Sequence, residues 1–108
     1  MVIYVSHPFQ GNPTNTMKVA DNVRKLLDSE LGENTFVSPI HAMGYLWDDV
    51  SYQKGLDMCL DLLGKCDAII MCGDWEDSIG CNTEFAYAKA KEMNIYYYIN
   101  GEIWDKAY

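Results

Sequence analysis

The residues best suited to chemistry lie around a short acidic loop between an apolar run and a helical pattern. The apolar run, residues 68–72, is too short for a helix, and Gly73 separates it from the loop, residues 74–77. Glu84 lies about two turns into the helix that is predicted to begin near Ser78. The dipole and N–H groups of a helix N-terminus favour an ionised carboxylate, which can act as a nucleophile or a base. Glu84 is therefore the candidate catalytic residue.

The start of the chain repeats the order of strand, loop and helix. Residues 2–5 are apolar, and with Ser6 they predict a central strand buried on both faces. Asn12 followed by Pro13 predicts the start of a helix. Apolar residues then recur at helical spacing, which predicts that one face of this helix packs on the sheet: Met17, Ala20, Val23, Leu27 and Leu31.

The rest of the chain continues the alternation of strands and helices. Strands are predicted at residues 35–38, 68–72 and 95–99, a helix capped by Ser51 ends at Leu63, and Asn94 is expected to cap the helix that carries Glu84. Residues 40–50 show no period and contain Trp47, and we expect them to cover the edge of a crevice. A turn at Asn100 and Gly101 leads into the tail.

This alternation predicts a single domain over residues 1–108 with a three-layer α/β fold, similar to flavodoxin and Rossmann folds. The parallel sheet has about four strands in the order 2-1-3-4, with helices on both faces. The topological switch point then lies between strands 1 and 3, where ligands bind in such sheets. Residues 6–11 and 73–78 are expected to line it.

Composition limits the kinds of partner. The chain has 8 basic and 16 acidic residues, a formal charge of −8, which disfavours polymeric nucleic acid and an anionic membrane surface. A single nucleoside or nucleotide needs only a local site and stays possible. No apolar run has the length of a membrane span, and the start reads as a strand instead of a charged leader, so we expect a cytoplasmic protein.

Common cofactor and metal motifs are absent from the sequence. Neither GxxxxGK[ST] nor GxGxxG occurs, and His7 and His41 are the only histidines. We expect no cofactor and no metal. The four cysteines form no CxxC pair, and we expect them to be reduced, buried thiols.

Three segments resemble a known superfamily. The opening IYVSHPFQG, the run CDAIIM and the segment GDWEDSIGCNTEFAYAKA resemble the nucleoside 2-deoxyribosyltransferase-like superfamily, and most of all its small, uncharacterised (DUF4406-like) branch. The resemblance covers nearly the whole chain, and its specific parts are the first loop and the third helix. The pattern GW..S.G...E...A is carried here by Trp75, Ser78, Gly80, Glu84 and Ala88.

The resemblance implies an enzyme that cleaves the N-glycosidic bond of deoxynucleosides or deoxynucleotides, as a hydrolase or a transferase. A glutamate attacks the anomeric carbon in that superfamily, and it matches Glu84. The tyrosine that positions the nucleophile matches Tyr4. Ser78 falls where relatives that act on 5'-monophosphates carry serine, which favours a phosphate-bearing substrate. Active sites of the superfamily are completed across a subunit interface, so a homo-oligomer is expected.

One position departs from the superfamily. An aspartate that serves the leaving base is expected eight residues before Asp67, where this chain has Cys59. Asp57 and Asp61 are each two residues away, and two residues rotate a helical side chain by about 200°. We therefore consider Asp74 or Asp77 as the acid in its place.

Several candidate residues have a structural alternative. Trp75 or Phe9 would stack on the base, Trp75 being expected as an exposed indole, and His7, Gly11 and Gly80 are further candidate substrate contacts. Tyr4 can equally be a core tyrosine, Ser78 only a helix cap, His7 a loop residue and Glu84 a solvated surface group. A second function also stays open, in which the same pocket binds a nucleotide without turnover, as a sensor or sponge.

Overall fold

A five-stranded sheet forms the centre of the computed structural model, which describes residues 1–9 and 13–105. The strand order is β2-β1-β3-β4-β5, and every pairing is parallel except that of β4 with β5. The α/β class and the order of the first four strands are therefore confirmed. The strands are β1 Val2–Ser6, β2 Thr35–Val37, β3 Ala68–Cys72, β4 Asn94–Ile99 and β5 Glu102–Trp104.

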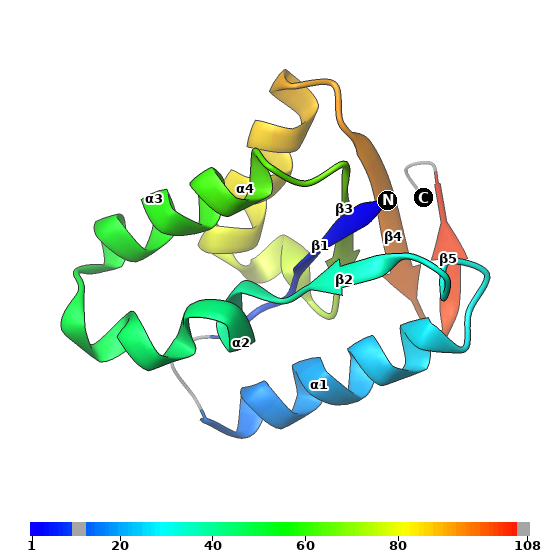
Figure 1. Ribbon diagram of the computed structural model, residues 1–108, viewed down its shortest axis with the longest axis horizontal. Helices are drawn as coiled ribbons and strands as arrows, with labels where there is room; N and C mark the ends of the chain where they lie inside the picture. The colour runs from blue at the N-terminus through cyan, green and yellow to red at the C-terminus, as the bar shows by residue number, and fades with distance from the viewer. Residues whose placement is uncertain (10–12, 106–108) are drawn as a thin grey trace.

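Helices cover both faces of this sheet, as predicted. Figure 1 shows α1 on one side and α3 and α4 on the other. One core cluster joins buried residues of α1 and α2 to the sheet, and a second joins those of α3 and α4 to it. The helical elements are α1 Pro13–Leu27, α2 Pro39–Met43, the 3-10 turn η1 Gly44–Asp49, α3 Tyr52–Leu63, the 3-10 turn η2 Trp75–Asp77 and α4 Ile79–Ala90.

Strand alternation decides which side chains of β1 reach each helical layer. Ile3 and Val5 belong to the cluster of α1 and α2, whereas Tyr4 belongs to that of α3 and α4. Successive side chains of a strand point to opposite faces, so Ser6 lies on the same face as Tyr4. Both residues are fully buried. The end of β1 therefore presents two hydroxyl groups toward α3 and α4.

The predicted apolar face of α1 is wrong in part. The helix ends at Leu27, and Met17 and Leu27 are exposed, whereas Val19 and Leu26 are fully buried. Val19, Val23 and Leu26 follow the spacing i, i+4, i+7, which places them on one helix face. The sequence carries apolar residues on two neighbouring faces of α1. The face that packs on the sheet is the one that carries Val19, Val23 and Leu26.

Several elements after β2 differ from those predicted from the sequence. Residues 40–50, expected without regular structure, form most of α2 and all of η1. Asn94 does not cap α4, which ends at Ala90, because it is already the first residue of β4. The tail adds β5 through a hairpin turn in which Asn100 and Gly101 have positive φ. In the part of the chain that the structure describes, no helix is long and apolar enough to cross a membrane.

The four cysteines are free thiols, but their burial differs from the prediction. Cys72 and Cys81 are buried, whereas Cys59 and Cys66 are partly exposed. Cys59 is partly exposed because it lines a pocket.

Candidate functional site

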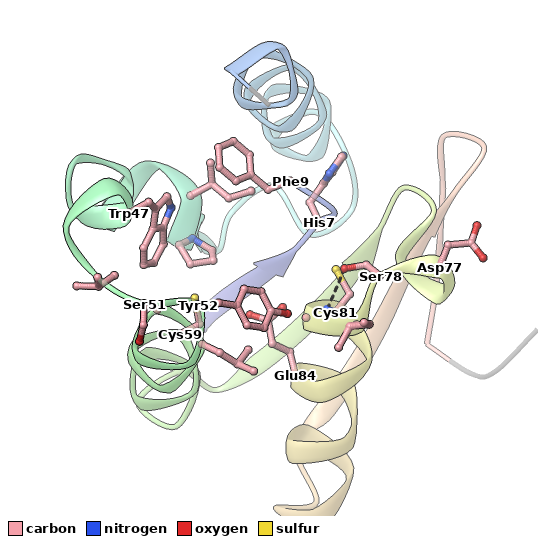
Figure 2. Close-up of a pocket in the computed structure, with 17 residues that line it drawn as sticks. His7, Phe9, Trp47, Ser51, Tyr52, Cys59, Asp77, Ser78, Cys81 and Glu84 are labelled. Atoms are coloured by element: carbon pink, nitrogen blue, oxygen red, sulfur yellow. Dashed lines mark hydrogen bonds between the residues drawn. The ribbon is translucent and has the colours of Figure 1, made fainter. Parts of the chain in front are cut away.

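A pocket of about 680 Å³ opens beside the carboxyl end of β1, at the predicted topological switch point. This volume is within the range that holds a small organic ligand. The lining comes from the loop after β1, from α2 and η1, from α3, and from the start of α4. Figure 2 shows Glu84 between the side of the pocket that carries Trp47 and the side that carries Ser78.

Both carboxylate oxygens of Glu84 accept hydrogen bonds from β1. The Tyr4 hydroxyl donates to Oε2, and the Ser6 hydroxyl donates to Oε1 at 2.8 Å. Glu84 is 6% exposed and reaches the pocket, so it is not a solvated surface group. A buried carboxylate needs such donors, because an unpaired charge inside a protein is costly. The two hydroxyls fix the direction of the carboxylate.

Burial and hydrogen bonding act on Glu84 in opposite directions. Burial raises the pKa of the Glu84 carboxyl, and the hydrogen bonds from Tyr4 and Ser6 oppose this rise. Burial, together with the neighbouring charge of Glu84, raises the pKa of the Tyr4 hydroxyl well above its ordinary value. Tyr4 therefore stays a hydrogen-bond donor and does not compete with Glu84 for ionisation.

A thiol lies close to this group. Cys59 on α3 lines the same pocket. Burial, and next the charge of Glu84, raise the pKa of the Cys59 thiol to about 11. A thiol that holds its proton this firmly is a poor nucleophile. Where the resemblance implies a carboxylate, the pocket thus presents a neutral group.

The ring of His7 is held in one neutral form. Nδ1 donates to the Pro8 carbonyl at 2.9 Å, and Nε2 accepts from the Asn22 side-chain amide at 2.9 Å. Burial lowers the pKa of His7. Gly73 has φ of 62°, and a Cβ built there would lie 3.2 Å from the His7 ring. His7 lines the pocket with a ring whose two nitrogens are already engaged.

The start of α4 forms the wall of the pocket on the side away from Trp47. The Ser78 hydroxyl accepts a hydrogen bond from the Cys81 backbone N–H at 3.2 Å, which confirms the predicted N-cap. A Cβ built on Gly80 would have no atom closer than the Tyr52 hydroxyl at 3.8 Å and the Ser78 hydroxyl at 3.9 Å. Gly80 thus leaves open the space between α3 and α4.

The structure brings together most of the candidate residues. Tyr4 contacts Glu84. Five other candidates line the pocket together with Glu84: His7, Phe9, Asp77, Ser78 and Gly80. Asp77 lies at the margin, and its carboxylate points away from Glu84 in Figure 2. Asp74 lies at a separate hollow near the end of β4. Gly11 and the predicted cap Asn12 lie outside the described residues.

The prediction that Trp75 is an exposed indole is wrong. Trp75 is 8% exposed and packs with the rings of Phe85 and Tyr97 at centroid distances of 5.0 and 6.1 Å. It belongs to the core cluster under α4 and does not line the pocket. The acidic residues beside Trp75 make the loop look exposed, and no local pattern shows that Phe85 and Tyr97 leave room for the indole. Tyr97 is buried, and β4 is an inner strand, whereas the predicted order 2-1-3-4 placed the fourth strand at the edge of the sheet.

Two features of the site were not assigned from the sequence. Ser6 was placed at the crevice without a partner, although its spacing of two from Tyr4 on a strand places both on one face. Residues 40–50 were expected to cover the crevice, but the apolar character of the wall that they help to form opposite α4 was not predicted. This wall is formed in part by Trp47, which packs on α3 beside Gly55, where a Cβ would lie 3.4 Å from the indole.

The arrangement as a whole holds one ionisable carboxylate at the floor of a largely apolar pocket. Such a group can attack an electrophilic carbon or stabilise a positive charge. Among residues 1–9 and 13–105, no cluster of three or more histidine, cysteine or acidic side chains is placed to hold a metal ion.

Comparison with known proteins identifies a family and a related solved structure. The model of a family described as a domain of unknown function, DUF4406, matches residues 1–97. The structure of a 2-deoxyribosyltransferase from Leishmania mexicana is similar with a TM-score of 0.63 and 22% sequence identity, over 90% of this chain and 63% of that chain. At this identity the similarity establishes the fold, and the chain spans 63% of the enzyme's length. No curated protein matches the sequence. The chain belongs to the DUF4406 family and has the 2-deoxyribosyltransferase fold.

Proposed function

We propose that the protein cleaves the N-glycosidic bond of a nucleoside or nucleotide, with Glu84 as the nucleophile. The observation that carries this proposal is the buried carboxylate, held by Tyr4 and Ser6, which faces a pocket of ligand size in a 2-deoxyribosyltransferase fold. Burial in a cleft and specific partners are typical of functional carboxylates.

The reaction proceeds in two steps. Glu84 attacks the anomeric carbon as the bond from that carbon to the base nitrogen breaks, and a glycosyl ester forms. The positive charge that develops on the sugar is stabilised by the adjacent carboxylate. Water then cleaves the ester in a hydrolase, or a second base does so in a transferase. Tyr4 and Ser6 hold the carboxylate in direction throughout.

The start of α4 supports a substrate with a 5'-phosphate. Ser78 and Gly80 line the pocket there, and a helix N-terminus attracts anions. If a phosphate binds there, a deoxynucleoside 5'-monophosphate is cleaved with a higher kcat/KM than its nucleoside. Ser78→Asp should remove that preference, because it places a carboxylate where the phosphate would lie.

Release of free base tests the proposal. The protein is incubated with deoxynucleosides and their 5'-monophosphates, and base is separated by chromatography. Wild type should release base, and Glu84→Gln should release none above background. Glu33→Gln serves as a matched control, because Glu33 is exposed and lies outside the pocket. Base release by Glu84→Gln at the wild-type rate would exclude Glu84 as the nucleophile.

A binding protein is the second candidate, and Cys59 is the observation that favours it. The pocket lacks a carboxylic acid at the position where the resemblance implies one, and its thiol is firmly protonated. A nucleotide sensor or sponge needs the pocket but no acid. Nucleotides that raise the melting temperature without losing their base would support this alternative.

A further inference from the structure

The pocket has an apolar, partly aromatic wall on the side away from α4. Its side chains come from the loop after β1, from α2, from η1 and from α3, and they include Phe9, Ile40, Trp47, Val50 and Leu56. In Figure 2, Phe9 and Trp47 lie on this side of Glu84, and Ser78 lies on the other. If the sugar reacts at Glu84 with its 5' end toward α4, the leaving group lies against this wall. An aromatic ring fits it by contact and stacking.

The charges of the pocket favour a cation. Among the described residues that line it there is no lysine and no arginine, whereas Glu84 and Asp77 are acidic. The formal charge of the chain is −8. Aromatic faces attract a cationic ring, and a surrounding negative potential concentrates cations. A positively charged aromatic ring is therefore better matched to this wall than a neutral or anionic one.

The hydroxyls that contact Glu84 and the ring N–H of His7 are already committed to other acceptors, and the Asp77 carboxyl group points away from Glu84. The hydroxyls of Tyr4 and Ser6 donate to Glu84 itself, and Nδ1 of His7 donates to a backbone carbonyl. The Cys59 thiol is too weak an acid to protonate a departing base, its pKa being raised to about 11. A neutral nucleobase leaves as an anion unless it is protonated, whereas a cationic ring leaves as a neutral molecule and needs no acid.

Building on the proposed function, we propose that the preferred leaving group is an aromatic ring that carries a positive charge before cleavage, as in N-alkylated purine glycosides or pyridinium glycosides. Glu84 forms an ester bond to the anomeric carbon, and the electron pair of the broken carbon–nitrogen bond neutralises the ring, which leaves without a proton. Water then hydrolyses the ester: its hydroxyl group goes to the sugar, its second proton goes to solvent, and Glu84 is restored as a carboxylate.

A matched pair of substrates tests this inference. 7-Methyl-2'-deoxyguanosine and 2'-deoxyguanosine share one sugar and one ring system and differ by a methyl group and its charge. Each enzymatic rate is divided by the uncatalysed rate of the same compound. General acid catalysis contributes about 100-fold or more where it operates. Without an acid, the rate enhancement for the neutral compound should be no larger than that for the cation. The kcat/KM of the neutral compound should be lower than that of the cation by at least about 100-fold.

A binding measurement adds a readout that does not depend on turnover. 1-Methylnicotinamide is a pyridinium cation, and nicotinamide is its neutral counterpart. In calorimetry the cation should bind more tightly than nicotinamide, and added salt should weaken the binding of the cation. Trp47→Leu should reduce the affinity for the cation. Tyr45→Leu is the matched control, because Tyr45 lies in the same η1, is 78% exposed and does not line the pocket.

The outcomes separate this inference from the proposed function. If the neutral nucleoside shows the larger rate enhancement, or if both nicotinamides bind equally, the preference for a cation is wrong while glycosidic cleavage stands. If neither glycoside is cleaved and none of the deoxynucleosides or monophosphates releases base, the proposed function is wrong and the inference falls with it. Faster cleavage of the cation with Trp47-dependent binding supports both.

Discussion

Two features of the structure act in opposite directions on the charge of the Glu84 carboxylate. It is buried, which disfavours its charge, and it is bound by two hydroxyls, which favour it. Resemblance identified Glu84, Tyr4 and Ser78 from sequence, and the structure places Glu84 and Ser78 in the lining of one pocket and Tyr4 in contact with Glu84. The partner role of Ser6 and the burial of Trp75 were not predicted, because both depend on residues distant in sequence.

Replacing Glu84 with glutamine should stabilise the protein at neutral pH. The pKa of Glu84 is raised in the folded state, so its contribution to stability is full below the unfolded pKa and is lost as pH rises through the folded pKa. A neutral amide of the same shape avoids this loss. We expect an increase of about 0.5–2 kcal/mol in the free energy of unfolding, typical where a functional site costs stability.

Denaturant unfolding of wild type and Glu84→Gln across the acid range measures this effect. The difference should disappear at pH values below the ordinary glutamate pKa, where wild type is protonated as well. Glu33→Gln should show no such gain. A Glu84→Gln variant that is less stable than wild type at neutral pH would contradict the burial argument.

Removing the Ser6 hydroxyl should raise the pKa of Glu84 further. The Ser6 hydrogen bond favours the charged carboxylate, and hydrogen bonds to charged groups contribute about 1.5–3 kcal/mol. Glu84 should therefore titrate at a higher pH in Ser6→Ala than in the wild type. The Glu84 carboxyl resonance, followed by NMR against pH, reports it without any need for turnover.

The same substitution has a kinetic readout if the enzyme is active. The acid limb of the pH–rate profile should move to higher pH in Ser6→Ala, because Glu84 must be ionised to attack. Ser29→Ala removes a hydroxyl that donates to the Leu26 carbonyl at the end of α1 and should leave the limb in place. An unchanged Glu84 titration in Ser6→Ala would show that Ser6 does not act on the carboxylate.

At the scale of elements, the strands and helices next to the site were predictable and those at the margins were not. β1, β3 and the starts of α3 and α4 have clear patterns: apolar runs, a serine cap and a glycine break. α2 and η1 are short and without a period, so their fold depends on packing against the sheet. β5 is three residues long and forms only because β4 offers an edge.

Adding a methyl group at Gly80 should separate stability from binding. The space beside Gly80 is open, so Gly80→Ala should leave the stability unchanged or raise it by up to about 1 kcal/mol through helix propensity. The methyl group would lie between Tyr52 and Ser78 and narrow the pocket. Thermal unfolding and nucleotide titration measure the two effects.

Gly44→Ala is the control for this substitution. A Cβ at Gly44 would meet no atom within 4 Å, and Gly44 does not line the pocket. Its nucleotide affinity should equal that of wild type. If Gly80→Ala binds nucleotide as tightly as wild type, the ligand does not occupy the space between α3 and α4.

At the scale of the whole molecule, the chain exposes large apolar side chains at the mouth of the pocket. Tyr52 and Ile79 are 69% and 77% exposed and extend from the starts of α3 and α4. Composition predicted neither their positions nor this grouping, since it reports only totals. Exposed apolar groups that cluster in this way are typical of protein contacts.

We therefore expect a homo-oligomer that covers this mouth. Sedimentation at micromolar concentration should show a species larger than the monomer, and Ile79→Glu should shift it toward the monomer. Met17→Glu is the matched control, because Met17 is 69% exposed on α1, which packs on the opposite face of the sheet. A strictly monomeric wild type, or equal effects of the two variants, would contradict this expectation.

Mass spectrometry of acid-quenched protein tests the central claim most directly. The protein is mixed with a glycoside that it cleaves, quenched within the first turnover and digested, and the peptide that contains Glu84 is analysed. The account predicts a mass increase equal to the glycosyl group, located on Glu84 and absent from Glu84→Gln. Base release without any adduct on Glu84, or an adduct on another residue, would contradict it.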